Sequence, residues 1–67
     1  MKTKFNTIKE AKANVMEGYT VIKLIQDTIH YRKGTVLIGE YDVVAKEYIV
    51  HDNGVRYIGE DRVKVCK

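Results

Sequence analysis

The residues of this chain that could do chemistry are few, and none is spaced for catalysis. The sequence contains no serine, and its single cysteine, Cys66, stands at the penultimate position of 67 residues. A Cys66 thiolate could in principle pair with His30 or His51, but catalytic groups must be held to within about 0.5 Å, and a terminal residue is a poor platform for that. Zinc needs three or four clustered ligands, and these residues lack ligand spacing. We therefore predict no nucleophile and no metal site.

Two pairs of carboxylates are the remaining candidates for acid–base chemistry, Glu40 with Asp42 and Glu60 with Asp61. General acid catalysis requires carboxyl groups in a concave, partly dry pocket, which a chain of this size rarely encloses. Each pair follows a glycine where a strand is expected to end, so a polar strand exit is the simpler interpretation. No glycine-rich phosphate loop is present, and we predict a protein that is not an enzyme and has no cofactor.

Nucleic-acid binding is an alternative that the sequence leaves open. Small barrels bind RNA or DNA through basic loops and stacked aromatic rings, and this chain has five tyrosines and a formal net charge of +3. The basic side chains gather in the two terminal regions, whereas residues 40–61 are acidic, which argues against a uniform cationic surface. For this alternative we predict the binding residues Lys2, Lys4, Tyr31, Arg32, Lys33, Arg62 and Lys64.

Length and composition indicate one globular domain over residues 1–67. The hydrophobic fraction of 45% and charged fraction of 31% exclude a disordered chain, and a core of this size gives modest stability. A lone cysteine fits a reducing compartment, so we expect a cytoplasmic protein. No apolar run reaches the roughly 18 residues of a membrane span, and no secretory signal is visible.

One helix is predicted near the start of the chain, from Thr7 to about Glu17. Thr7 and Glu10 have the spacing of a capping box, and Gly18 follows as a residue that can end a helix in the left-handed conformation. The apolar residues at helical spacing are Ile8, Ala11 and Val15. Residues 19–66 read as β-rich, with short strands predicted at Tyr19–Ile25, Thr28–Arg32, Thr35–Ile38, Tyr48–His51, Val55–Ile58 and Val63–Cys66.

The β-rich region contains an internal repeat. The pattern Gly-x-x-x-Ile-Gly-Glu occurs at Gly34–Glu40 and again at Gly54–Glu60, which predicts one hairpin pattern used twice, with Ile38 and Ile58 in equivalent core positions. Asn-Gly is the strongest short hairpin signal. A two-residue Asn53-Gly54 turn would pair Ile49 with Ile58 and His51 with Arg56 on one face, and Val50 with Tyr57 on the other.

The strands and turns together resemble an SH3-like small β-barrel. The resemblance lies in Lys33-Gly34-Thr35-Val36-Leu37 and in the ending Val55–Val65, which looks like a last hairpin strand, a 3₁₀ turn and a closing strand. The sequence signatures of proline-rich ligand recognition are absent. The resemblance implies an α+β fold in which the N-terminal helix packs on a small, strongly bent, five- to six-stranded antiparallel sheet; it does not fix a function.

Protein binding is the function that we predict. The partner-binding residues would be Tyr48, Val50, Val55, Arg56 and Tyr57 in the second predicted hairpin, where Arg56-Tyr57 replaces the Val36-Leu37 of the first copy of the repeat. Aromatic anchors dominate interface energetics, although this tyrosine face could instead be the core. In size and lysine content the chain resembles small accessory proteins of bacteriophages, which implies inhibition of a host protein. A homodimer is a third alternative.

Overall fold

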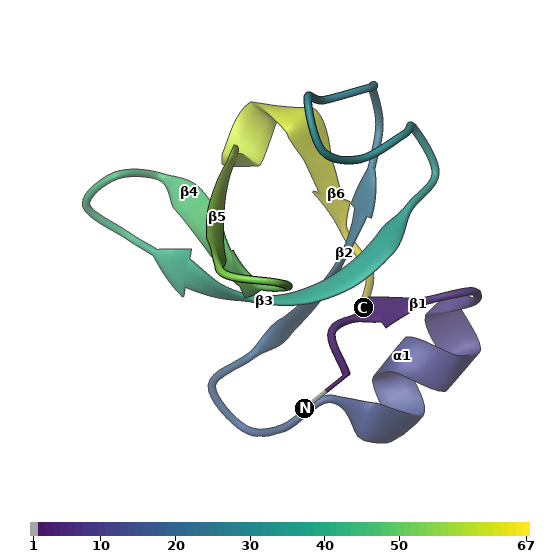
Figure 1. Cartoon of the computed structure of the whole chain (residues 1–67). Helices are drawn as coiled ribbons and strands as arrows, with labels where there is room; N and C mark the ends of the chain where they lie inside the picture. Colours follow the sequence, from purple (N-terminus) through teal and green to yellow (C-terminus); the bar gives the residue numbers. More distant parts are fainter. Residues whose placement is uncertain (1) are drawn as a thin grey trace.

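A computed structural model describes residues 2–67, so Met1 of the predicted domain lies outside the described residues. The elements in chain order are β1 (Lys4–Phe5), α1 (Ile8–Asn14), β2 (Thr20–Leu24), β3 (Val36–Asp42), β4 (Glu47–His51), β5 (Val55–Gly59), the 3₁₀ helix η1 (Glu60–Arg62) and β6 (Val63–Val65) (Figure 1). Among these residues, no helix is long and apolar enough to cross a membrane.

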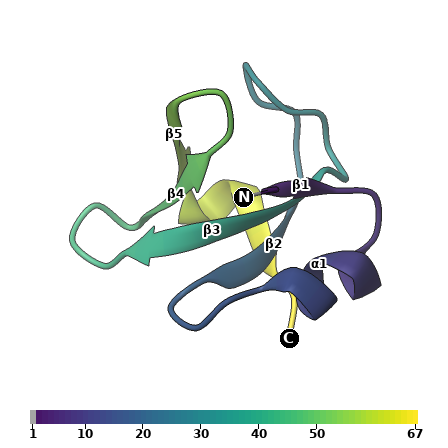
Figure 2. The same ribbon diagram turned by 60° about the horizontal axis from the view of Figure 1, so that its bottom comes forward.

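The strands form one antiparallel sheet in the order β5-β4-β3-β2-β6, with β1 also paired to β3. The long strand β3 is shared: residues 36–39 pair with β2 and residues 40–42 with β4. Figure 2 shows the two halves of the sheet extending from β3 in different directions. The end strands β5 and β6 do not pair with each other within the described chain. The predicted α+β fold, an N-terminal helix packed on a small barrel, is therefore wrong: the described residues are mostly sheet, the sheet is open, and its one α-helix is only seven residues long.

Side chains, rather than strand pairing, fill the space between the two ends of the sheet. Tyr31, Ile58 and Val63 are all buried there, in one cluster with the largest buried side chains of the concave face. That cluster comprises Ile22, Leu24, Tyr31, Leu37, Tyr48, Val50, Ile58 and Val63.

A second cluster lies beneath α1, where Ala11 is fully buried. Its buried members are Phe5, Ala11, Val21, Val36 and Ile38. The Thr7 side chain accepts a hydrogen bond from the Glu10 N–H at 3.1 Å, which confirms the predicted helix start. The predicted end at Glu17 is wrong: α1 stops at Asn14 because Val15 is extended. Gly18, at φ +86°, instead completes a turn in which the Tyr19 N–H bonds the Met16 carbonyl.

The β4–β5 turn contains three residues, Asp52–Gly54, instead of the predicted two. Asn53 and Gly54 both have positive φ, as expected, but Asp52 joins the turn and donates its N–H to the Gly54 carbonyl. The register therefore shifts by one residue, to Tyr48 with Ile58 and Ile49 with Tyr57. Because side chains alternate between the faces of a strand, this shift moves Tyr57 to the face opposite Tyr48.

The two copies of the repeat do not form equivalent hairpins. Thr28–Arg32, predicted as a strand, has no strand structure and belongs to the loop between β2 and β3. Gly39 lies inside β3, whereas Gly59 ends β5. Ile38 and Ile58 are both buried, but in different clusters. The repeat thus reflects turn glycines and buried isoleucines that serve two different local structures.

Candidate functional site

The predicted tyrosine face is split by the observed register. Tyr48 and Val50 are buried in the concave core, at 7% and 0% exposure, and cannot contact a partner without unfolding. Val55 and Tyr57 lie on the opposite face of β5 and are exposed by 51% and 62%. Arg56 is half-buried and faces the core side. Three of the five predicted residues are therefore available to a partner, although they do not form one flat aromatic surface.

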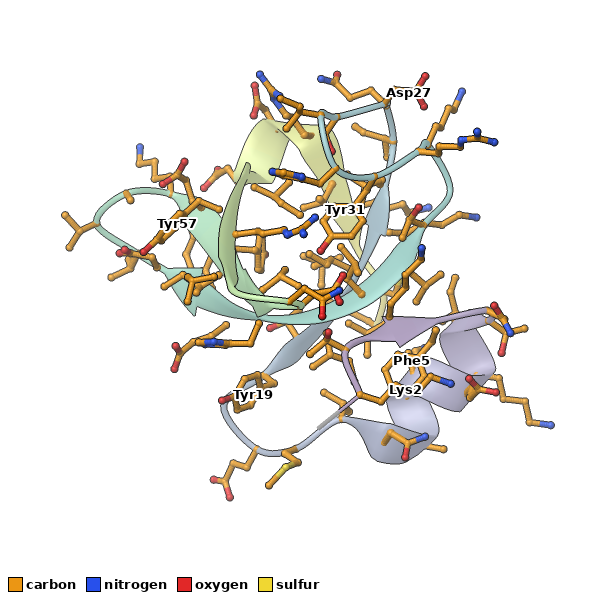
Figure 3. All side chains as sticks on the ribbon, in the orientation of Figure 1. Lys2, Phe5, Tyr19, Asp27, Tyr31 and Tyr57 are labelled. Atoms are coloured by element: carbon orange, nitrogen blue, oxygen red, sulfur yellow. The ribbon has the colours of Figure 1, made fainter. Side chains whose placement is uncertain are left out.

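Arg56 belongs to a polar network that links β5 to the loop between β2 and β3. Its guanidinium carbon lies 5.6 Å from the centroid of the Tyr31 ring, a cation–π distance. The Tyr31 hydroxyl donates to Asp52 Oδ2 at 2.8 Å. Burial, the hydrogen bond to Asp52 and the Asp52 charge raise the pKa of Tyr31 to about 12, against the opposing Arg56 charge. This network fixes the loop against the end of the sheet, and Figure 3 shows Tyr31 on the concave side.

The segment Thr28–Tyr31 forms a tight, internally bonded wall. The Thr28 N–H donates to the Tyr31 carbonyl at 2.7 Å, and the Tyr31 N–H donates to Thr28 Oγ1 at 3.0 Å. Ile29 at its tip is 93% exposed. A hollow of about 350 Å³ lies between this wall, β5 and η1, and Ile29, Arg56 and Tyr57 are among its lining residues.

The outer edge of β5 is open. In an antiparallel pair, successive residues alternate between bonding the neighbouring strand and pointing away from it. The Glu60 N–H bonds the Lys46 carbonyl at one end of the β4–β5 pair, and Tyr48 opposes Ile58. Every second residue from Glu60, namely Ile58 and Arg56, therefore forms its backbone hydrogen bonds with β4. Tyr57 lies between them, so its N–H and C=O groups point away from β4, to the open edge. We call this edge, with Tyr57, Val55 and Ile29, the β5 edge site.

Tyr41 makes a second tyrosine–carboxylate contact, on β3. Its hydroxyl donates to Glu60 Oε1 at 2.5 Å, and its ring centroid lies 4.9 Å from that of Tyr48. The hydrogen bond to Glu60, followed by burial, raises the pKa of Tyr41 to about 12, and burial raises the pKa of Tyr48. Glu60 is thus occupied in holding η1 to β3.

The residues predicted for nucleic-acid binding do not come together in one place. Lys2 pairs with Glu10 at 3.4 Å and lies over the Phe5 ring, beside it in Figure 3. Tyr31 and Arg62 line the hollow beside β5, whereas Lys33 and Lys64 line a different one. The remaining two, Lys4 and Arg32, are exposed and line neither hollow.

The hollow that contains Lys33 and Lys64 is a cationic groove of about 750 Å³, which sequence reasoning missed. Its lining includes five exposed lysines, Lys12, Lys23, Lys33, Lys64 and Lys67, and no carboxylate side chain. Ile8, Leu24, Ile25 and Val65 supply an aliphatic floor. We call this feature the lysine groove. Its lysines are far apart in the sequence. The pairing of β2 with β6 brings Lys23 and Lys64 together, and Lys12 on α1 and Lys33 in the loop before β3 line the same groove.

Comparison of the chain with protein-family models, curated proteins and solved structures finds no significant match. Within residues 2–67, no three His, Cys, Asp or Glu side chains are placed to hold a metal ion together. The β5 edge site and the lysine groove both have geometry suited to binding. A third hollow, of about 390 Å³, is lined by Thr3, Tyr19, Ile38 and His51.

Proposed function

We propose that this protein is a non-enzymatic binding protein whose β5 edge site takes an extended segment of a partner protein. The proposal rests on one observation: β5 is an end strand, so the backbone N–H and C=O groups of Tyr57 have no strand to pair with on that side, and the Tyr57 side chain is itself 62% exposed. An extended peptide can add as a further strand to such an edge, with main-chain hydrogen bonds for affinity and pockets for alternate side chains.

The surroundings of the edge support this mode of recognition. Natural sheets protect open edges with charged residues, proline or very short strands. The strand β5 is five residues long, its one charged residue, Arg56, faces the core side, and its exposed side chains are Val55 and Tyr57. Ile29 and Tyr57 form an apolar rim around the adjacent hollow. An added strand would place one set of its side chains in that hollow and the alternate set beside Val55.

The resemblance in size and composition to phage accessory proteins supplies the kind of partner that we expect. Bound at the β5 edge site, the chain would cover a strand of a host protein and inhibit it by occlusion. The fixed position of Thr28–Tyr31, held by the Tyr31–Asp52 hydrogen bond, lowers the entropy cost of forming such a complex because the wall is already ordered.

Tyr57→Pro tests the backbone mechanism: it removes the ring together with an N–H that points to the open edge, where proline is tolerated in sheets, so its comparison with Tyr57→Ala isolates the N–H. Tyr57→Ala is the matched control, because it removes the ring and keeps the N–H. The immobilised full chain would be exposed to an extract of the organism that encodes it, and retained proteins would be crosslinked from position 29. We expect the wild type to retain a partner, Tyr57→Ala to retain it more weakly, and Tyr57→Pro to lose it. Equal retention by wild type and Tyr57→Pro would contradict strand addition.

A further inference from the structure

The lysine groove has a counterpart at the opposite end of the same molecule. Residues 43–46 form the turn between β3 and β4, in which Val43 and Val44 are 73% and 89% exposed. We call this turn the valine tip. In Figures 1 and 2 it projects from the side of the molecule away from α1 and the C-terminus, near which the groove residues lie. A molecule therefore cannot place its own tip in its own groove.

The valine tip is ordered, although it is exposed. Asp42 Oδ1 accepts hydrogen bonds from the Val44 and Ala45 N–H groups at 3.0 and 3.2 Å, and the Asp42 carbonyl accepts one from the Lys46 N–H at 2.8 Å. These bonds hold the turn in shape, with two adjacent valines exposed at it. A preformed apolar protrusion loses little conformational entropy when it binds.

The charges of the two features are complementary and internally unfavourable. In the groove, Lys23 of β2 lies directly opposite Lys64 of β6. Beside the tip, Asp42 of β3 lies directly opposite Glu47 of β4. Like charges directly opposite each other destabilise a strand pair, so the fold holds one unfavourable cationic pair and one unfavourable anionic pair, at opposite ends. Lys46 lies in the turn itself and offsets one of the two carboxylates, which leaves Asp42, Lys46 and Glu47 with a net charge of −1 (+1 − 2) facing a groove lined by lysines. Contact between the two ends would relieve both pairs.

We propose that the valine tip of one molecule docks in the lysine groove of a second copy, so that copies join head to tail. The valines would contact the aliphatic floor, and the Asp42–Glu47 pair would face the Lys23–Lys64 pair. The interface is heterologous: each copy offers one tip and one groove, and the assembly grows beyond a dimer unless the rotation closes a ring. The groove floor contains no aromatic ring, which favours an aliphatic occupant over the bases of a nucleic acid, since those stack on aromatic side chains.

Sedimentation of the full-length chain and two variants tests this proposal. The tip variant is Val43→Asn with Val44→Asn, and the groove variant is Lys33→Glu with Lys64→Glu; all four side chains are exposed, so both variants should fold. Lys4→Glu with Lys9→Glu is a control with the same charge change outside the groove. We expect the wild type and the control to reach average masses above a dimer as concentration rises, and to dissociate as salt screens the charges. Each of the other two variants should be monomeric.

Mixing the tip and groove variants gives the decisive result. Each retains one functional surface, so the mixture should form a one-to-one heterodimer and nothing larger. A wild type that stays monomeric at low salt, variants that still assemble, or a mixture without heterodimer would each overturn the proposal. Assembly that persists in both variants would assign self-association to the β5 edge instead. A monomeric wild type that binds oligothymidylate, with binding lost in the groove variant, would assign the groove to nucleic acid.

Discussion

Alanine substitution of Tyr48 and of Tyr57, one at a time, distinguishes a core residue from a residue of the β5 edge site. Tyr48 is 7% exposed and packs in the concave cluster, whereas Tyr57 is 62% exposed on the opposite face and its strand neighbour is Ile49. A predicted two-residue turn would have placed both rings on one face. The pair of substitutions therefore tests the register of the hairpin as well as the location of the site.

The expected losses of unfolding free energy differ by several-fold. Truncating a buried aromatic residue to alanine costs about 3 to 5 kcal/mol, and a domain of this length has a total stability of about 3 to 10 kcal/mol. Tyr48→Ala should therefore lose between about a third and all of the stability of the fold. Tyr57→Ala loses mainly its cross-strand contact with Ile49, which is worth about 0.2 to 1 kcal/mol.

Urea denaturation followed by far-ultraviolet circular dichroism measures both losses. Tyr48→Phe is the control, because it keeps the buried ring and should remain close to wild type. If Tyr57→Ala cost more than about 2 kcal/mol, or Tyr48→Ala less than about 1 kcal/mol, the register would be wrong. Tyr57 could then no longer serve as the centre of an exposed binding edge.

Three further predictions concern the strand crossing, alkaline stability and the helix start. Gly39→Ala should cost about 1 to 3 kcal/mol in urea denaturation, because an added Cβ would lie 3.2 Å from both the Ile49 carbonyl oxygen and Val50 Cγ2; a neutral result would mean that β3 and β4 are less closely packed. The pKa of Tyr31 is higher in the folded than in the unfolded chain, so its contribution is complete below pH 10 and is lost as pH rises from 10 towards 12. Tyr31→Phe should therefore show a smaller loss of stability than wild type over this range, and equal losses would contradict the pKa shift. Thr7→Ala should cost about 0.5 to 2 kcal/mol by loss of the helix cap, measurable as a lower urea midpoint, and an unchanged midpoint would show that the cap contributes nothing.

Features encoded by neighbouring residues could be predicted from the sequence. The Thr7 cap, the positive φ of Asn53 and Gly54, and the 3₁₀ helix before β6 all follow from local chemistry. The length of the Asn-Gly turn could not, because both registers satisfy that chemistry. The observed register is the one that buries Tyr48 and Val50 together with Ile58, and this choice depends on the packing of the whole concave face.

The lysine groove could not be predicted from the sequence, for a similar reason. Its lysines carry no motif, and each one alone is an ordinary exposed cation. The antiparallel pairing of β2 with β6 sets Lys23 opposite Lys64, and the loop before β3 adds Lys33. Strand order, which local patterns do not encode, therefore determines where the positive charge gathers. The nucleic-acid alternative named two of these lysines without predicting that they would share a groove with an aliphatic floor.

Thr28–Arg32 was predicted to be a strand and is not one. It shows that a segment forms a strand only where a neighbouring strand has an unpaired edge. Its residue types favour a strand, but a strand needs an unoccupied partner. The first half of β3 is already paired on one side with β2 and on the other with β1. The segment is therefore excluded from that sheet edge and folds on itself, with Tyr31 turned into the core and Ile29 left outside. Because this segment does not join the sheet, Ile29 lies beside the open edge of β5 instead. The wrong strand prediction and the candidate binding site therefore have the same physical cause.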